Sequence, residues 1–386
     1  MNRRHFITST AGAWTAAHLT GNRSNLYSGS RKYRAAVIGH TGVGGYGHGW
    51  DEAFNPFDSI DVVAVADPDD TGRSEVMAHT GAKQGYRDYQ EMLRKENPEL
   101  VAICPHALDH RLEMVTAAAE SGAHILMEKP FARDLVEADA MVKAIRNSGV
   151  KVQVGLVTAT LPMTQRVLQM VRQGEIGVLQ EIRARGKEDR RAGGEDLMVL
   201  GCHLMHLLRM FAGNPKWVFA HVTEHESEMK RGHAREKQGP GSMGALAGDQ
   251  VAAMFYLGQG VHAYFGSKAN DVKTGRRFGI YLYGSKGVIY LPTVSGAAIL
   301  RSPDWHSGAW KPVELTEEEQ AGSDQLATLM VADLLQAIEE DREPAVNEYD
   351  GRWTTEMISS VYESQLTDAR VAFPLKNRTH PLERGV

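Results

Sequence analysis

Short apolar runs alternate with helical stretches between residues 35 and 154, and this alternation is the clearest structural pattern in the chain. Runs typical of strands buried on both faces occur at 35–38, 62–66, 100–104, 124–127 and 151–154. Helical spacing follows at 90–96, at Leu112, Val115 and Ala119, and at 137–147, with Gly122 and Gly149 ending the last two helices. Strands that alternate with helices predict a parallel sheet with helices on both faces.

The second half has a different pattern, in which β-branched and aromatic runs lie between glycine-bearing turns. The runs at 251–257, 261–265, 279–283 and 288–291 predict an antiparallel meander, and helices are expected at 164–173, 197–211, 323–341 and 356–368. Because 386 residues exceed what one hydrophobic core supports, we expect an α/β protein of two domains that meet near residue 155.

The N-terminal residues are predicted to form a targeting segment. Arg3 and Arg4 precede Phe6, a mildly apolar stretch and a polar linker, which looks like a twin-arginine export signal over residues 1–33. The alternative is a basic, disordered start, in which case the protein is expected in the cytoplasm. Export to the periplasm in the folded state would favour a cofactor that is held tightly and regenerated within each turnover.

Composition narrows the class of partner. The net charge of -5 gives no basic surplus, so neither nucleic acid nor an anionic membrane is an expected partner. No apolar run approaches the length of a membrane-spanning helix. Cys104 and Cys202 are too few for a disulfide scaffold, and whether they lie close together is open.

A glycine-rich turn directly follows the first apolar run. Gly39, Gly42 and Gly45 stand one residue wider than the GxGxxG spacing, and the next apolar run ends on Asp67. Glycines let the backbone approach a pyrophosphate, a following helix would present its N-terminus, and a carboxylate at the position of Asp67 binds ribose hydroxyls. The order predicts a dinucleotide site that takes NAD, with NADP less favoured.

Lys129 ends a predicted parallel strand in the segment Glu128-Lys129-Pro130. The carboxyl ends of such strands line the ligand crevice, and a partly desolvated lysine there can hydrogen-bond a substrate hydroxyl. The alternative is an exposed lysine at a turn, where most lysines lie.

His203 and His206 share one face of the helix predicted at 197–211. A histidine beside a hydroxyl-bearing carbon can accept the hydroxyl proton. Metal binding by the pair and a buried structural role for His206 are the alternatives, and no metal is expected because a third ligand is missing. In the charged stretch before this helix, Lys187 and Glu195 are candidate contacts for substrate hydroxyls, unless the stretch is simply a solvated surface.

Taken in order, these motifs resemble the Gfo/Idh/MocA family, the relatives of glucose-fructose oxidoreductase and inositol dehydrogenase. GEIG at 174–177, Gly201-x-His203, GSKGVIYL at 284–291 and RTHPL at 378–382 extend the resemblance over residues 34–386. It implies a Rossmann domain at 34–155 and an α/β domain at 156–386 with a large, mostly antiparallel open sheet that binds substrate and forms homo-oligomers, as dimers or tetramers. It also implies a nicotinamide cofactor and a carbohydrate or polyol substrate.

The resemblance assigns roles to particular residues. Lys129 becomes a catalytic lysine whose backbone Pro130 fixes, and His203 becomes the proton acceptor. His48 and His110 match histidines that recur in the first domain. Glu128, Pro105 and His106 join the glycines and Asp67 at the cofactor, with the segment Cys104-Pro105-His106 standing where the family usually has Thr-Pro-Asn.

The chain also departs from the family pattern around His203. The aspartates expected four residues before and three residues after it are Val199 and His206 here. Asp196 is therefore our candidate for the acid that assists His203, with Glu195 as its alternative, and His206 becomes a candidate substrate contact.

Three functions remain open. The first is an NAD-dependent oxidoreductase acting on a sugar, sugar acid or cyclitol hydroxyl. The second is a redox-neutral enzyme that oxidises a sugar transiently, cleaves or epimerises it, and returns the hydride from a retained cofactor. The third is a nucleotide-binding relative without catalytic activity.

Overall fold

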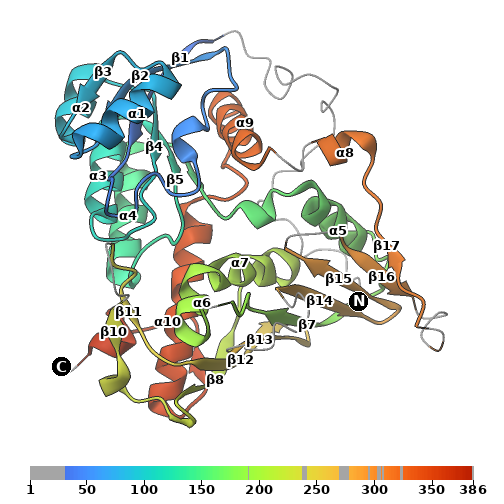
Figure 1. Cartoon of the computed structure of the whole chain (residues 1–386). Coiled ribbons are helices and arrows are strands. Elements are labelled where there is room, and N and C mark those ends of the chain that lie inside the picture. Colours follow the sequence, from blue (N-terminus) through green and yellow to red (C-terminus); the bar gives the residue numbers. More distant parts are fainter. Residues whose placement is uncertain are drawn as a thin grey trace.

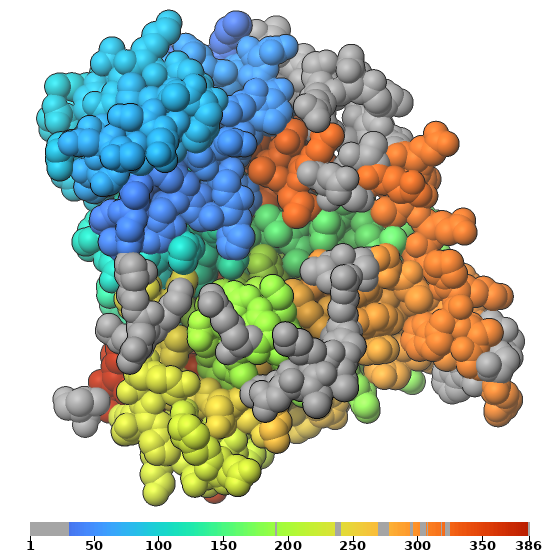
Figure 2. Space-filling model, in the orientation of Figure 1, coloured from blue at the N-terminus to red at the C-terminus, as the bar shows by residue number. Residues whose placement is uncertain are grey.

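The computed structural model describes residues 31–189, 191–236, 241–268, 278–293, 296–301, 306, 308–321 and 325–384. Most of the predicted export segment, residues 1–30, lies outside this part of the chain. Figure 1 shows the first domain above and the second below, and Figure 2 shows the two packed against each other.

The predicted parallel sheet is confirmed. Its strands run in the order β3-β2-β1-β4-β5-β6 with parallel pairing throughout. They are β1 (Tyr33–Ile38), β2 (Ile60–Ala66), β3 (Gln84–Tyr86), β4 (Leu100–Ile103), β5 (His124–Met127) and β6 (Val152–Val154). The connecting helices are α1 (Asp70–Thr80), α2 (Tyr89–Glu96), α3 (Arg111–Glu120) and α4 (Leu135–Ser148). Aspartates cap α1, α2 and α4 by accepting backbone N–H bonds, and Gly81 and Gly149 end α1 and α4 in the left-handed conformation.

The connection between β1 and β2 differs from the prediction. In place of the helix expected after the glycines, turns lead into a 3-10 helix, η1 (Trp50–Glu52). The sequence GHTGVGGYGHG explains the difference, because Gly42, Gly44, Gly45, Gly47 and Gly49 all adopt positive φ and interrupt a right-handed helix.

A helix from far along the chain covers the sheet face beside this connection. Met330, Val331, Leu334 and Leu335 of α9 (Leu326–Glu339) pack in one cluster with buried side chains of β1, β2, β4 and η1. The segment after residue 155 thus completes the core of the first domain, as α9 beside β1 in Figure 1 illustrates.

The second domain is built on a mixed, mostly antiparallel sheet. Its order is β17-β16-β15-β14-β7-β13-β12-β8-β18, with β9 paired to β8. The strands are β7 (Leu179–Arg185), β8 (Trp217–Glu224), β9 (Ser227–Glu228), β12 (Gln250–Gly258), β13 (Val261–Lys268), β14 (Gly279–Gly284), β15 (Gly287–Pro292), β16 (Ala298–Arg301), β17 (Lys311–Pro312) and β18 (Val371–Ala372). A separate ribbon joins β10 (Arg235–Glu236) to β11 (Ala245–Leu246).

The predicted meander is interrupted at its centre. Strand β7 lies between β13 and β14, parallel to the first and antiparallel to the second. Its sequence alternates, with Ile182 and Ala184 buried and Arg183 exposed between them. The charged outward positions concealed a strand that occupies the middle of the sheet.

Among the described residues, helices cover one face of this sheet, and exposed side chains such as Phe219, Tyr264 and Tyr281 lie on the other. The helices of the second half are α5 (Pro162–Arg172), α6 (Gly193–Val199), α7 (Gly201–Ala212), α8 (Glu317–Ala321), α9 and α10 (Glu348–Thr367). In Figure 1, α6 and α7 lie between the sheet and the first domain. The helix predicted over 197–211 is in fact two helices that meet at Leu200.

The C-terminal segment joins the two domains. Glu356 of α10 is fully buried and accepts hydrogen bonds from Arg352 Nη1 at 2.7 Å, Arg378 Nη1 at 3.0 Å and the Leu375 N–H at 2.7 Å. Arg378 also bonds Asp139 of α4. The Arg of the RTHPL motif thus ties the chain end to a helix of the first domain. None of the described helices is long and apolar enough to cross a membrane.

Candidate functional site

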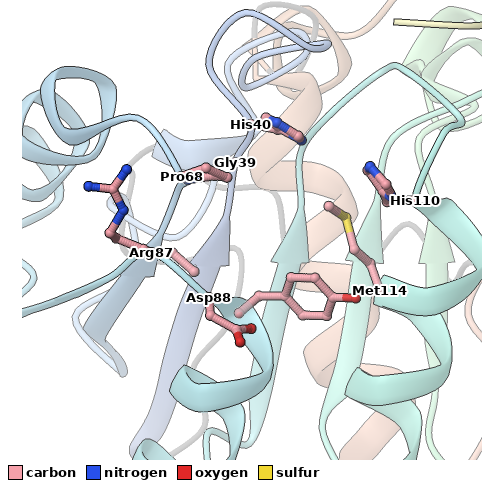
Figure 3. A pocket seen from close by; sticks show the side chains of 9 residues that line it. Gly39, His40, Pro68, Arg87, Asp88, His110 and Met114 are labelled. Carbon is pink, nitrogen blue, oxygen red and sulfur yellow. The ribbon is translucent and has the colours of Figure 1, made fainter.

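A cavity of about 240 Å³ opens at the carboxyl ends of β1, β2 and β3, beside the start of α3. The strand order reverses between β1 and β4, and this switch point is where open α/β sheets bind ligands. The cavity is lined by Gly39, His40, Ala66, Pro68, Arg87, Asp88, Tyr89, His110 and Met114. Figure 3 shows Arg87 and His110 on opposite sides of it, and the rings of His40 and His110 stack with centroids 6.0 Å apart.

The glycine-rich turn packs tightly on its neighbours at three glycines. A Cβ on Gly39 would lie 2.1 Å from the Tyr46 ring, one on Gly44 would lie 2.6 Å from the backbone nitrogen of Ala107, and one on Gly47 would lie 2.5 Å from the Cys104 carbonyl oxygen. Gly42 and Gly45 have open space around them but adopt φ of 83° and 54°. Of the three predicted cofactor glycines, Gly39 therefore allows close packing, while Gly42 and Gly45 allow the turn.

Asp67 lies in the chain between Ala66 and Pro68, which both line the cavity. Its carboxylate is fully buried and accepts hydrogen bonds from the Thr41 N–H at 2.9 Å, the Thr41 hydroxyl at 2.8 Å and the Asp69 N–H at 2.9 Å. Asp67 thereby fixes the glycine-rich turn against the end of β2. Contact between this carboxylate and a ribose stays a prediction. Such contact would require Thr41 to lose at least one of its two hydrogen bonds to Asp67.

Lys129 is buried at the end of β5, with only 5% of its surface exposed. Its ammonium donates to the Val199 carbonyl oxygen at 3.1 Å, across the boundary between the domains. The Lys129–Pro130 peptide is cis. The neighbouring Glu128 is fully buried and accepts from the Lys129 N–H at 2.7 Å and from both the backbone N–H and the ring Nδ1 of His48. Burial raises the pKa of Glu128, but the His48 bond and the Lys129 charge outweigh it, and the net pKa lies below its usual value.

Arg111 is a site component that the sequence analysis missed. Its guanidinium is buried and donates to the carbonyl oxygens of Glu128, Pro130 and Pro105. Burial lowers the pKa of Arg111 to about 10. The arginine therefore joins the turn that carries Lys129 to the loop that carries Pro105 and His106. An arginine in the first turn of a predicted helix looks like a surface residue, so no sequence signal pointed to this role.

His203 of α7 lies in the same buried cluster as Lys129. Only 6% of His203 is exposed, and its Nδ1 lies 3.3 Å from the Thr158 hydroxyl. Burial lowers the pKa of His203 well below its usual value, and the nearby charges of Lys129, His48 and His206 lower it further. The imidazole is therefore neutral near pH 7 and has an acceptor nitrogen available.

Asp196 is placed close to the end of β7. Its carboxylate accepts from the Ser267 hydroxyl at 2.7 Å and from the N–H groups of Lys187 at 3.3 Å and Glu188 at 3.2 Å. Burial raises the pKa of Asp196 above its usual value despite these bonds. These contacts hold the segment after β7, and a role in assisting His203 stays a prediction.

The other predicted substrate contacts are more dispersed. The Lys187 ammonium is half-exposed and lies 3.5 Å from Asp189, and Glu195 is half-buried near Arg191. His206 is buried one turn after His203, with Nδ1 3.7 Å from Asp350 of α10. His106 is half-buried and packs through its backbone on Gly44. The structure thus brings Glu128, Lys129 and His203 together and places His206 toward α10.

Two other features lie near the site. Cys104 and Cys202 are buried free thiols, and burial raises the pKa of both. Among the described residues, one group of side chains, Asp51, Glu52 and His79, is close enough to hold a cation, and it belongs to η1 and α1.

Family models match both halves of the chain. The model described as oxidoreductase family, NAD-binding Rossmann fold, matches residues 33–156, and the GFO/IDH/MocA C-terminal domain matches residues 164–290.

Similar proteins include several named sugar dehydrogenases. D-xylose 1-dehydrogenase (NADP(+)) 2 of Haloferax volcanii is 28% identical over 177 residues, 42% of this chain and 53% of that protein. D-apiose dehydrogenase of Paraburkholderia graminis is 31% identical over 147 residues, 38% of each chain. The chain thus spans about half the length, or less, of these curated relatives.

Solved structures share the fold over nearly the whole chain. Levoglucosan dehydrogenase with NADH and levoglucosan superimposes with a TM-score of 0.74 at 18% identity, covering 89% of this chain and all of the other. An oxidoreductase from Agrobacterium radiobacter with NAD+, L-tartaric acid and magnesium gives a TM-score of 0.69 at 16% identity, covering 88% and 98%.

Proposed function

Because the chain belongs to the GFO/IDH/MocA oxidoreductase family, we propose that it is an NAD-dependent dehydrogenase acting on a hydroxyl of a sugar, sugar acid or cyclitol. The observation that carries this proposal is the buried pair of Lys129 and His203, one at the end of β5 and the other on α7. The sugar dehydrogenases among the relatives support the substrate class.

The residues at the cavity fit a dinucleotide. Gly39 and Gly44 leave no room for side chains where the turn packs, and the cavity offers polar groups at Arg87, Asp88 and His110 for an adenosine. Nicotinamide supplies the hydride acceptor when it is bound. NAD is preferred in this proposal because the carboxylate of Asp67 would repel a 2′-phosphate.

Lys129 and His203 act on the substrate hydroxyl. The Lys129 ammonium is positioned by Arg111 and the cis-Pro turn, and it donates a hydrogen bond to the hydroxyl oxygen as negative charge develops there. Neutral His203 orients the hydroxyl through a hydrogen bond from its ring N–H to the hydroxyl oxygen. Burial of both side chains excludes water from the reacting carbon.

The redox-neutral reaction is the second candidate. Its support is the twin-arginine-like segment at Arg3 and Arg4, because a periplasmic enzyme needs a cofactor that stays bound. In that case the same pair would act on a glycoside, and export by the twin-arginine route is part of this proposal. A nucleotide-binding relative without activity is less well supported, since Lys129 and His203 are both present.

We also propose that the protein forms a homo-oligomer through the open face of its second sheet. Outward-facing side chains align across paired strands there, in the order Tyr290, Tyr281, Arg183, Tyr264, Met254 and Phe219. Tyr290 and Met254 are half-buried and the other four are exposed. Arg183 pairs with Glu181 within its own strand, so a second copy related by a two-fold axis could exchange these charges. Aromatic rows of this kind on an open sheet are typical of an interface.

The test begins with the purified protein, without added cofactor. Denaturation releases any bound nucleotide, which is then identified and quantified together with its redox state. NADH formation from added NAD and a polyol or sugar supports the dehydrogenase, and glycoside turnover without added NAD supports the redox-neutral enzyme. A protein that binds NAD but turns over neither class overturns both.

Lys129→Met tests the role of the lysine, and Lys143→Met is its matched control. We expect turnover to fall by about 1,000-fold while NAD still binds, because the lysine acts on the hydroxyl proton. Lys143→Met, at an exposed position of α4, is the control and should behave as the wild type. Equal activity of Lys129→Met and the wild type would remove Lys129 from the mechanism.

A further inference from the structure

His48 and Glu128 form a histidine–carboxylate pair that the proposed mechanism does not use. Nδ1 of His48 bonds Oε1 of Glu128, and the His48 N–H donates to the same oxygen at 3.1 Å. The Glu128 side chain is fully buried, whereas 64% of the His48 side chain is exposed. A carboxylate on Nδ1 favours the tautomer with a proton there and leaves Nε2 as a proton acceptor.

The same carboxylate is connected to the predicted catalytic lysine. Oε2 of Glu128 accepts the Lys129 N–H at 2.7 Å, so one buried group fixes both His48 and the turn that carries Lys129. Burial and the Lys129 charge lower the pKa of His203 most, and a positive charge on His48 lowers it further. His48, Lys129 and His203 therefore form one cluster, although they come from the glycine-rich turn, β5 and α7.

The buried members of the cluster cannot release a proton to water by themselves. Lys129 is 5% exposed and His203 is 6% exposed. Burial and the Lys129 charge lower the pKa of His203, so its protonated form is unfavourable near neutral pH. Oxidation of an alcohol to a carbonyl releases one proton in each turnover. The site therefore needs a proton acceptor that contacts solvent.

We propose that His48 carries the hydroxyl proton of the substrate from Lys129 to solvent, an inference that rests on the proposed dehydrogenase function. The Lys129 ammonium gives one of its protons to Nε2 of His48 and takes the hydroxyl proton in its place, while the carbon-bound hydrogen leaves with its electron pair to NAD. The products are a carbonyl compound, NADH and one proton. Ionised Glu128 stabilises the imidazolium that forms, and the imidazolium then gives its proton to water.

His48→Gln tests this role, because its amide can still donate to Glu128 but cannot carry a proton. We expect turnover to fall by about 100-fold and to be partly restored by imidazole in the buffer, while affinity for NAD changes less than about twofold. His221→Gln is the matched control, since His221 is also exposed and lies 3.0 Å from a carboxylate, Glu228, on the open sheet. This control should match the wild type.

A second measurement needs no substrate or cofactor. Nitrogen NMR of histidine-labelled protein reports which ring nitrogen of neutral His48 is protonated, and the signal lost in His48→Gln identifies the residue. We expect the proton on Nδ1. A proton on Nε2, or an equal mixture, would overturn the inference.

The kinetic outcomes separate this inference from the function on which it rests. If the wild type turns over and His48→Gln has the same turnover number, only the proton-carrier role is wrong. If the variant loses NAD affinity but keeps its turnover number at saturation, His48 is a binding residue and the role is again wrong. If the wild type binds NAD but oxidises no polyol or sugar, both the proposed dehydrogenase function and the proton-carrier role of His48 are wrong.

Discussion

Gly47 carries two constraints at once, whereas Gly45 carries one. Both residues adopt positive φ, at 64° and 54°. A Cβ on Gly47 would also lie 2.5 Å from the Cys104 carbonyl oxygen and 2.6 Å from Cγ of Glu128, whereas one on Gly45 would meet open space. The two glycines therefore separate backbone strain from steric overlap.

We expect Gly45→Ala to lower the free energy of unfolding by about 1 to 2 kcal/mol, the cost of a left-handed conformation. Gly47→Ala should cost about 1 to 3 kcal/mol more, because the new methyl group displaces Glu128 or the β4 backbone. Urea denaturation of both variants measures the difference. Equal losses would show that the close contact at Gly47 is absent.

At the residue scale, the sequence could indicate where candidate site residues lie, but not which groups they contact. Lys129 and His203 could be placed because strand ends and helix faces are visible in the hydrophobic pattern. Arg111 and Thr41 could not, since their partners are backbone carbonyls and a carboxylate brought close only by the fold. Asp196 was assigned from chain distance alone, and its contacts are with Ser267 and the segment after β7.

At the element scale, five of the six strands of the first sheet could be predicted to within two residues at each end, because buried parallel strands are uniformly apolar, whereas the short, exposed β3 was missed. Strand β7 was hidden by its charged outward positions, and the break between α6 and α7 at Leu200 leaves no mark in the apolar spacing. The helix expected after the glycines was replaced by turns, because five glycines with positive φ follow one another there.

The short C-terminal helix η5 (Pro381–Glu383) depends on a buried histidine at its start. His380 accepts the Leu382 N–H at 3.3 Å and packs on Tyr362 of α10 with ring centroids 5.6 Å apart. Burial, and then the charge of Arg384, lower the pKa of His380 to about 4. The folded protein thus holds this ring neutral at pH values where an unfolded histidine is protonated.

The stability that His380 contributes should be fully present above about pH 6.5 and lost as the pH falls toward 4, because the unfolded chain binds the proton first. We expect a loss of about 2 to 3 kcal/mol by pH 4. His380→Asn retains an acceptor for Leu382 and should remove this part of the pH dependence. Urea midpoints of wild type and variant between pH 7 and pH 4.5 would contradict the assignment if they ran parallel.

At the scale of the whole molecule, the open sheet face predicts the state of assembly. Tyr264 is 38% exposed at the centre of the aromatic row, and the Arg183 guanidinium carbon lies 6.0 Å from its ring centroid. If the proposed homo-oligomer forms, we expect Tyr264→Glu to dissociate it into monomers, because each interface would then bury two unpaired carboxylates.

Sedimentation velocity at several protein concentrations measures this effect. Val136→Glu is the control, because Val136 is 54% exposed on α4 of the first domain, outside the sheet face. A wild type that sediments as a monomer, or a Tyr264→Glu variant that assembles normally, would exclude this face as the interface.

The change of pattern near residue 155 predicted a two-domain division, but no pattern predicted the crossing of α9 back to the first sheet. The sequence of the apolar helix at 326–339 does not indicate whether it packs on the first or the second sheet. Only the packing of Met330, Leu334 and Leu335 on β1 and β4 reveals its partner.

That packing has a consequence for the order in which the protein can be made. The ribosome completes residues 34–155 long before it reaches α9, so about 170 further residues are synthesised while one face of the nascent first sheet is uncovered. Its closing contacts are also among the most distant in the chain, which slows the final folding step. The first domain is therefore not expected to fold alone. If it were expressed without the rest of the chain, it would need α9 fused to it to complete its core.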